Sequence, residues 1–212
     1  RHTRCSRDWS SDVCSSDLTV VKNIRVTQSP QWLQDRLARS GMRPINNIVD
    51  ASNYVMLERN QPTHAYDLRS VESGFRVRFA KAGESLTTLD GQVRELHPAD
   101  IVIANGDDVA VGLGGVMGGL DSEVVESTTA IALEVAWFPT DTVLDAAARH
   151  GLRSEASARF ERGADPHGLE QAAWRFIEIL RLTCPDLEVH GAPQVVANSA
   201  CPPTVTVVEL RL

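Results

Sequence analysis

Apolar positions recur every three to four residues in some stretches of this chain and every second residue in others. Such a pattern predicts a fold of mixed helices and strands. The longer spacing predicts helices over 30–41, 44–59, 140–150 and 167–182. Alternation and short apolar runs predict strands over 19–26, 75–80, 101–104 and 130–138. A further hairpin is expected where Asp90 and Gly91 separate the apolar stretches 86–89 and 92–96.

The first and third of these helices have a clear apolar side. Ser29 is the expected cap of the first, before Pro30, and Gly41 is its expected end. We expect the following residues of the two helices to point inward: Trp32, Leu33, Leu37, Val143, Leu144, Ala147 and Ala148.

The helix expected from Pro44 is the most informative stretch of the chain. Its apolar spacing places Ile45, Val49, Ser52 and Met56 on one face, which predicts a buried side. Amides and short acids are weak helix formers, because their side chains compete for backbone hydrogen bonds. The list of such residues here is Asn46, Asn47, Asp50 and Asn53. They form either a polar network that ties the helix to a sheet or part of a functional site.

An extended segment with a histidine follows this helix directly. After Asn60 the chain passes through Gln61 and Pro62 and reaches His64. An imidazole can transfer protons near neutral pH, so His64 is a candidate catalytic residue. A histidine that only makes a structural hydrogen bond is the alternative.

Five glycines lie within nine residues, in the sequence VGLGGVMGG. The dinucleotide-binding pattern fails because Met117 stands where its third glycine is required, and no Lys-Ser or Lys-Thr pair follows for a nucleoside triphosphate. Glycine lets a backbone approach another group closely because it has no Cβ. Residues such as Gly115 and Gly118 therefore indicate tight packing or the wall of a ligand site, and the sequence leaves both interpretations open.

Glu134 is the single acid in the apolar strand AIALEVAWF. A carboxylate in such a strand is costly to bury unless it is paired or faces a ligand or cavity. Either Glu134 faces water at an edge of the sheet, or it belongs to a functional site.

Composition excludes several classes of protein. The 28 acidic residues outnumber the 21 basic ones, so the surface as a whole repels a nucleic acid backbone. No stretch approaches the roughly 20 apolar residues of a membrane span, and we expect a cytoplasmic protein without membrane contact. The four cysteines lack the spacing of a zinc site, and no metal site is predicted.

The stretch that follows the third helix mixes charges of both signs. Its arginines interleave with equal numbers of acidic residues, so a scaffold of ion pairs is as plausible as a contact with RNA.

The two ends of the chain differ from its centre. The sequence DWSSDVCSSDL resembles translated sequencing-adapter DNA, so 1–18 is expected to be a non-native leader. The expected organisation continues with the end of a preceding region and a connecting helix over 19–42, the main domain over 43–183, a linker over 184–202 and the truncated start of a further domain over 203–212.

Four ordered segments carry a resemblance to a known family. They are RPINNIVDASNYVMLERNQPTHAYD, LDGQVRELHPADIVIANGDDVAVGLGGVMGGLDSEV, ALEVAWFPTDTV and ARHGLRSEASARFERGADP. They resemble the editing domain of the beta subunit of bacterial phenylalanyl-tRNA synthetase, over roughly 43–178. We therefore expect an α+β fold of mixed, largely antiparallel sheets packed with helices, in a three-layer β-β-α sandwich.

The resemblance implies a site that hydrolyses tyrosine wrongly attached to phenylalanine tRNA. His64 would orient water or a ribose hydroxyl at the ester, assisted by Asn53, and Glu134 would accept the tyrosine hydroxyl. The remaining residues that the resemblance places at the substrate are Gly115, Gly118, Ser154 and Ala156. Ser154 replaces the threonine common in the family, which keeps the hydroxyl and removes a methyl group.

The resemblance also implies partners. A synthetase alpha subunit would complete an alpha2-beta2 heterotetramer, and phenylalanine tRNA would be held mainly by other domains. No cofactor is expected on this fragment, whereas ATP and Mg²⁺ are implied for the full synthetase. The alternatives are a free-standing trans-editing deacylase and an inactive module for subunit contacts.

Overall fold

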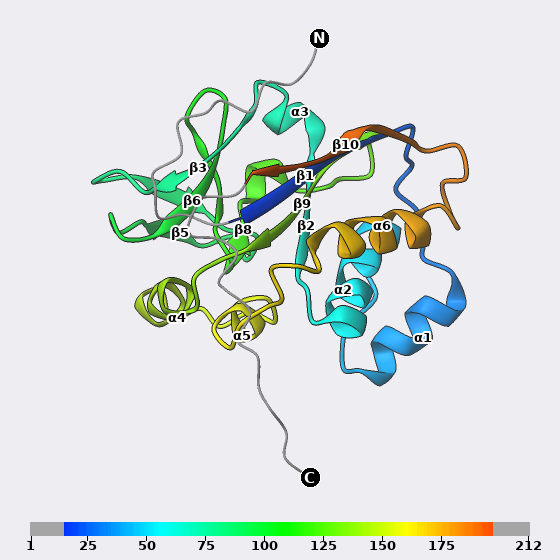
Figure 1. Ribbon diagram of the computed structural model, residues 1–212, viewed down its shortest axis with the longest axis horizontal. Coiled ribbons are helices and arrows are strands. Elements are labelled where there is room, and N and C mark those ends of the chain that lie inside the picture. The colour runs from blue at the N-terminus through cyan, green and yellow to red at the C-terminus, as the bar shows by residue number, and fades with distance from the viewer. Residues whose placement is uncertain (1–14, 197–212) are drawn as a thin grey trace.

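The computed structural model describes residues 15–196 and contains two four-stranded sheets, a small hairpin and several helices (Figure 1). The helices are α1 Gln31–Arg39, α2 Asn47–Arg59, α3 Leu68–Val71, α4 Thr140–Arg149, α5 Ser157–Phe160 and α6 Leu169–Leu180, with a 3-10 turn η1 at Leu120–Ser122. The strands are β1 Ser15–Lys22, β2 Thr63–Asp67, β3 Phe75–Phe79, β4 Ser85–Thr87, β5 Val93–Glu95, β6 Ile101–Asn105, β7 Ala110–Leu113, β8 Met117–Gly118, β9 Ala130–Trp137 and β10 Glu188–Val196.

The elements form three layers. One sheet has the strand order β10-β1-β9-β2 and the other β3-β6-β7-β8, and every pairing is antiparallel. Helices α1, α2 and α6 lie on one side of the first sheet, and the second sheet lies on its other side (Figure 1). The predicted α+β sandwich is confirmed, as are the hairpin at Asp90-Gly91 and the strand that contains Phe75.

Strand β9 separates two hydrophobic cores. Its odd-numbered residues from Ile131 to Val135 pack with α2 and α6, whereas Ala132 and Ala136 pack with the second sheet. Side chains alternate between the two faces of a strand. Glu134 therefore points, with its even-numbered neighbours, into the space between the sheets, and it is buried.

Helix α2 begins later than predicted and buries a different face. Asn46 is its N-cap and accepts hydrogen bonds from the backbone N–H groups of Ile48 and Val49, so Pro44 lies outside the helix. Ile45, expected inside, is 60% exposed. The residues of α2 that are buried are Asn47, Ile48, Asp50, Ala51, Tyr54, Val55 and Met56.

Most of the polar residues around the start of α2 form a structural network, but it ties the helix to the loops before α1 and after α6 and not to a sheet. The side chain of Asn47 donates to the carbonyl of Arg25 and to the hydroxyl of Thr183. Asp50 accepts a hydrogen bond of 2.6 Å from the hydroxyl of Ser29. Ser29 consequently makes no cap for α1, whose N-cap is Pro30 without a side-chain hydrogen bond. A buried polar group has to be satisfied, and these contacts do so across long stretches of sequence.

Three side chains predicted to point inward are on the surface: Trp32, Leu144 and Ala148. Trp32 is 37% exposed and packs edge-to-face on Tyr54, with Arg36 over its ring. Leu144 is 48% exposed, and Ala146 takes the inward position on α4. A helix buries only part of its circumference, and in both helices the buried side is narrower than predicted or lies beside the predicted one.

The first and last described strands cross the expected boundaries. Strand β1 begins at Ser15 and ends at Lys22, because Asn23 adopts a positive φ of 56°. Strand β10, at a position expected to be linker, pairs with β1. The remaining domain limits stay predictions. Most of the expected leader and the expected start of a next domain lie outside the described residues, in 1–14 and 197–212.

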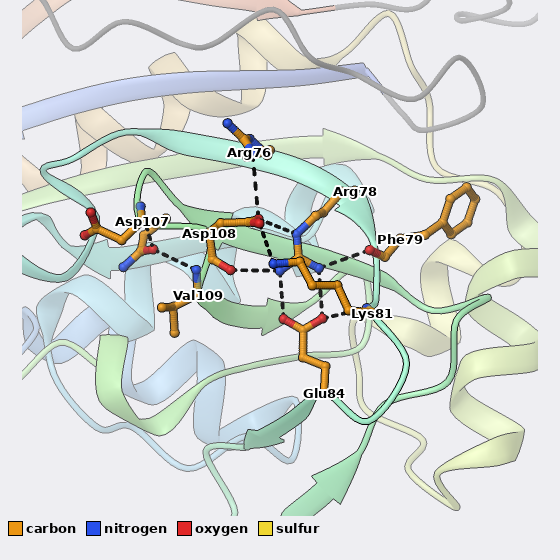
Figure 2. A network of polar contacts seen from close by, with 9 residues as sticks. Arg76, Arg78, Phe79, Lys81, Glu84, Asp107, Asp108 and Val109 are labelled. Carbon is orange, nitrogen blue, oxygen red and sulfur yellow. Dashed lines mark hydrogen bonds and ion pairs between the residues drawn. The ribbon is translucent and has the colours of Figure 1, made fainter.

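A group of ion pairs fastens the second sheet to the loops at its edge. Figure 2 shows Arg78 between two acids: its guanidinium makes two hydrogen bonds to the carboxylate of Glu84, of 2.7 and 2.8 Å, and one of 2.6 Å to the carboxylate of Asp108. Lys81 also pairs with Asp108. The side chain of Arg78 is only 13% exposed, so these charge-assisted bonds are better shielded from water than a surface ion pair.

Candidate functional site

A cavity of about 240 Å³ opens between the two sheets, and every residue predicted at the site lines it. A cavity of roughly 150 Å³ is large enough for benzene, so this one accommodates a phenol ring. The predicted residues that line it are Asn53, His64, Gly115, Gly118, Glu134, Ser154 and Ala156. Their individual roles toward a substrate stay predictions.

The pairing of β2 with β9 brings the two most important side chains together. His64 lies directly opposite Glu134 in the antiparallel register, although 70 positions separate them in the sequence. Directly opposite residues project from the same face, with Cα atoms about 4.5–5.5 Å apart. The imidazole and the carboxylate therefore lie side by side in the wall of the cavity.

Glu134 is buried with one hydrogen bond. The hydroxyl of Tyr66 donates to its Oε2 over 2.8 Å, and no other described residue bonds to either carboxylate oxygen. Burial raises the pKa of Glu134 to about 7, although the hydrogen bond from Tyr66 acts in the opposite direction. The free oxygen, Oε1, can accept a hydrogen bond from a group that enters the cavity.

His64 is held against the glycine run. Its Nε2 is buried, and no described residue bonds it. A Cβ on Gly118 would lie only 2.4 Å from the Cε1 and 2.5 Å from the Nε2 of His64. Burial lowers the pKa of His64 to about 4. The imidazole is therefore neutral at pH 7 and has a nitrogen lone pair that can accept a proton.

The glycines serve close packing within the protein as well as the wall of the cavity. A Cβ on Gly115 would lie 2.8 Å from a methyl carbon of Val143, and one on Gly114 would meet Ile101 at the same distance. The side chains of the protein itself thus occupy the space that the missing Cβ atoms leave. The interpretation as tight packing is confirmed for this run. The same glycines line the cavity, and their role as the wall of a ligand site stays a prediction.

Helix α2 supplies the next part of the wall. Ser52 ties it to β2, since its hydroxyl bonds to the backbone oxygen of Thr63 at 2.7 Å. One residue further on, Asn53 lines the cavity, and its side chain makes no hydrogen bond to any described residue. Glu134 on β9 thus lies opposite His64 on β2, and the helix that carries Asn53 is bonded to β2 beside them.

Ser154 connects two sides of the cavity. Its hydroxyl donates to the backbone oxygen of Val116 over 2.6 Å and accepts from the N–H of Ser157 at the start of α5. The hydroxyl of Ser154, a residue that the resemblance places at the substrate, joins the glycine run to α5. Ala156, beside it, leaves part of the cavity open.

The charged residues around α5 are mostly paired with one another. Arg153 pairs with Glu161, and Arg159 pairs with Glu155. These contacts support the scaffold interpretation of this stretch rather than a free basic surface.

Residues 15–196 contain no group of three or more His, Cys, Asp or Glu side chains that could hold a metal ion. No helix in the same part of the chain is long and apolar enough to cross a membrane. Cys184 is a buried free thiol.

Sequence reasoning missed several residues of the wall. Tyr66 was not predicted at the site, although its position two residues after His64 on the same strand indicates the same face. The apolar part of the wall includes Met56, Ile103, Phe138 and Phe160. Met56 lies on the predicted buried side of its helix, and Ile103 and Phe138 lie in predicted apolar strands, whereas no burial was predicted for Phe160. No local signal distinguishes a core residue from a cavity residue.

The chain is an α+β domain of two packed sheets and a helical layer, with a cavity that contains the buried carboxylate of Glu134. The chain matches the family model of the B3/4 domain over residues 17–185 and belongs to that family. It is similar to proteins named phenylalanine--tRNA ligase beta subunit. It is 42% identical over 200 residues to that of Lactiplantibacillus plantarum, 50% over 175 residues to that of Cutibacterium acnes, and 52% over 148 residues to that of Anaeromyxobacter dehalogenans.

The alignments cover most of this chain and a small part of each relative. They include 94%, 82% and 69% of this chain, in the same order, but 25%, 21% and 18% of the relatives. The chain therefore spans a quarter or less of the length of these proteins.

Proposed function

We propose that this chain is the editing part of a phenylalanine--tRNA ligase beta subunit and hydrolyses tyrosine wrongly attached to phenylalanine tRNA. The main support is Glu134, a buried carboxylate with one unbonded oxygen in a cavity of the size of an aromatic ring. The similarity to beta subunits supplies the substrate class.

Selection by this site depends on a hydroxyl group. Tyrosine exceeds phenylalanine by one phenol oxygen, and an apolar pocket rejects an added hydroxyl poorly. A buried carboxylate that is built to accept a hydrogen bond disfavours the ligand that lacks the donor, because Oε1 of Glu134 would then be left desolvated and unpaired. The cavity is thus suited to retain tyrosine and release phenylalanine.

The order of the wall residues suggests how the ester lies. With the phenol at Glu134, the amino acid runs past His64 on β2 toward Asn53 on α2. His64 then accepts a hydrogen bond from the attacking water or from a ribose hydroxyl, and Asn53 helps to position the ester. The water oxygen bonds to the acyl carbon, the ester bond to the ribose breaks, and the proton passes to the ribose oxygen. An aminoacyl ester is already activated, so orientation and one proton transfer suffice without a covalent intermediate.

The whole enzyme would provide the other functions. We expect an alpha subunit in an alpha2-beta2 assembly, with synthesis from ATP and Mg²⁺ on the alpha subunit and the tRNA held mainly by other domains. The chain's net charge of −7 agrees with that division, since it gives this part no general attraction for RNA. Translation places the assembly in the cytoplasm.

The test is release of tyrosine from mischarged phenylalanine tRNA by the complete heterotetramer with His64→Ala or Glu134→Gln. We expect each variant to deacylate the tRNA at least about tenfold more slowly, because each loses a contact that orients the ester or holds the phenol. Charging with phenylalanine should be unchanged, since that reaction takes place elsewhere.

Two exposed residues provide matched controls, His167→Ala and Glu126→Gln, neither of which lines the cavity. Normal editing by both site variants would leave the module as a structural part of the subunit. Editing by the isolated chain, at the rate of the heterotetramer, would instead identify a free-standing deacylase.

A further inference from the structure

We infer that Tyr66 is a positioning residue of this site. Its hydroxyl holds Oε2 of Glu134 and leaves Oε1 for the phenol of the substrate, which makes Tyr66 a determinant of the selection between tyrosyl and phenylalanyl esters. The inference rests on the proposed function. It places the phenol group of Tyr66 at Glu134, next to the position that the phenol group of the substrate would occupy.

The sheet register places Tyr66 at the carboxylate. Tyr66 pairs with Ala132, two residues before Glu134 on β9, so the tyrosine and the glutamate are diagonal neighbours on the face that points between the sheets. The tyrosine is 2% exposed, and its hydroxyl lies 2.8 Å from Oε2. A Cβ on Gly112 would lie 3.0 Å from this hydroxyl, so the glycine leaves the space that the hydroxyl requires.

Tyr66 is also fixed from other directions. Its ring packs edge-on against His64, with ring centres 4.4 Å apart, and against Phe75 at 5.0 Å. A side chain held on three sides presents its hydroxyl in one place. The carboxylate that it bonds is therefore kept in one rotamer, which pre-organises the acceptor for the substrate.

The consequence for selection follows from the chemistry of a carboxylate. An ionised carboxylate accepts several hydrogen bonds, and those to a charged group are roughly twice as strong as neutral ones. With Oε2 satisfied by Tyr66, Glu134 remains ionised more readily and its other oxygen accepts the substrate's phenol. Without the hydroxyl of Tyr66, the carboxylate can rotate, and its ionised form is less stable.

Titration supports the same arrangement. The titratable groups that face the cavity together with Glu134 are His64, Tyr66 and Glu155, and Glu155 is paired with Arg159. The hydrogen bond from Tyr66 opposes the effect of burial, so loss of this bond raises the pKa of Glu134 further above its usual range. If the preference for tyrosyl over phenylalanyl esters requires ionised Glu134, this preference then appears at a higher pH.

The experiment uses the heterotetramer with Tyr66→Phe and compares kcat/KM for deacylation of tyrosyl and phenylalanyl phenylalanine tRNA from about pH 6 to about pH 9. We expect the ratio of the two values at pH 7 to fall about tenfold, and the pH at which the ratio reaches half its maximum to move upward. Gly112→Ala, which crowds the hydroxyl but keeps the ring, should change both quantities in the same direction. Tyr54→Phe removes the other tyrosine hydroxyl of the chain, outside the cavity, and should change neither.

Charging activity and melting temperature check that each variant is folded. An unchanged ratio and an unchanged midpoint in Tyr66→Phe, together with loss of selection in Glu134→Gln, would overturn the inference and leave the proposed function intact. Normal selection in Glu134→Gln as well would overturn both.

Discussion

Replacement of Gly118 by alanine tests whether the position of His64 determines the proposed editing activity. The new methyl carbon would lie 2.4 Å from Cε1 and 2.5 Å from Nε2 of the imidazole, whereas ordinary contacts begin at 3.4 Å. The ring therefore has to move by about 1 Å. The backbone of Gly118 has no positive φ, so the effect is purely steric.

The size of the effect follows from this displacement. Overpacking of this kind destabilises a protein by about 1–3 kcal/mol, which a well-folded domain tolerates. A misplacement of about 1 Å in a catalytic group can reduce the rate about 10²-fold. We therefore expect Gly118→Ala to lose most of its editing while the fold remains.

The assay combines deacylation of tyrosyl phenylalanine tRNA with thermal unfolding of the heterotetramer. Gly168→Ala is the matched control, because its methyl carbon would meet Asp165 at 3.5 Å, an ordinary contact, and its φ is also not positive. Editing by Gly118→Ala at the normal rate, with the imidazole displaced in a structure of the variant, would refute a role for the position of His64.

Three further changes separate stability from activity. Ser154→Ala removes the hydroxyl that joins the glycine run to α5, and we expect the free energy of unfolding, measured with urea, to fall by about 1 kcal/mol. Ser154→Thr keeps the hydroxyl and should keep the stability of the parent. The pKa of Asp108 is lowered to about 2 by Lys81 and Arg78. The stability from these contacts is therefore present above about pH 4 and lost as the pH falls toward 2. Asp108→Asn should be less stable than the parent at pH 7 and equally stable at pH 2. The pKa of Glu134 is raised by burial to about 7, so its ionisation reduces stability as the pH rises from about 4.5 through 7. The free energy of unfolding of Glu134→Gln should exceed that of the parent by up to about 3 kcal/mol at pH 8 and should equal it at pH 4.

Much of the fold could be predicted because its signals are local. The alternation around Phe75, the Asp90-Gly91 turn and the apolar strand around Glu134 each depend on neighbouring residues, and the structure confirms all three elements. The buried face of α2 was predicted less well. Its polar residues are buried by contacts with distant segments, such as the bond from Asn47 to Thr183, and apolar spacing alone contains no information about them.

The sequence by itself determined which side chains were candidates: an imidazole after Pro62, one acid in an apolar strand, and a glycine run. Those candidates are visible because backbone sterics and side-chain periodicity act over a few residues. Only the tertiary structure decided that His64 stands opposite Glu134 and that Tyr66 bonds to the acid, because both depend on the register of two strands about 70 positions apart. Register is set by how the two sheets and the helices bury their apolar faces together, and that is a property of the whole fold.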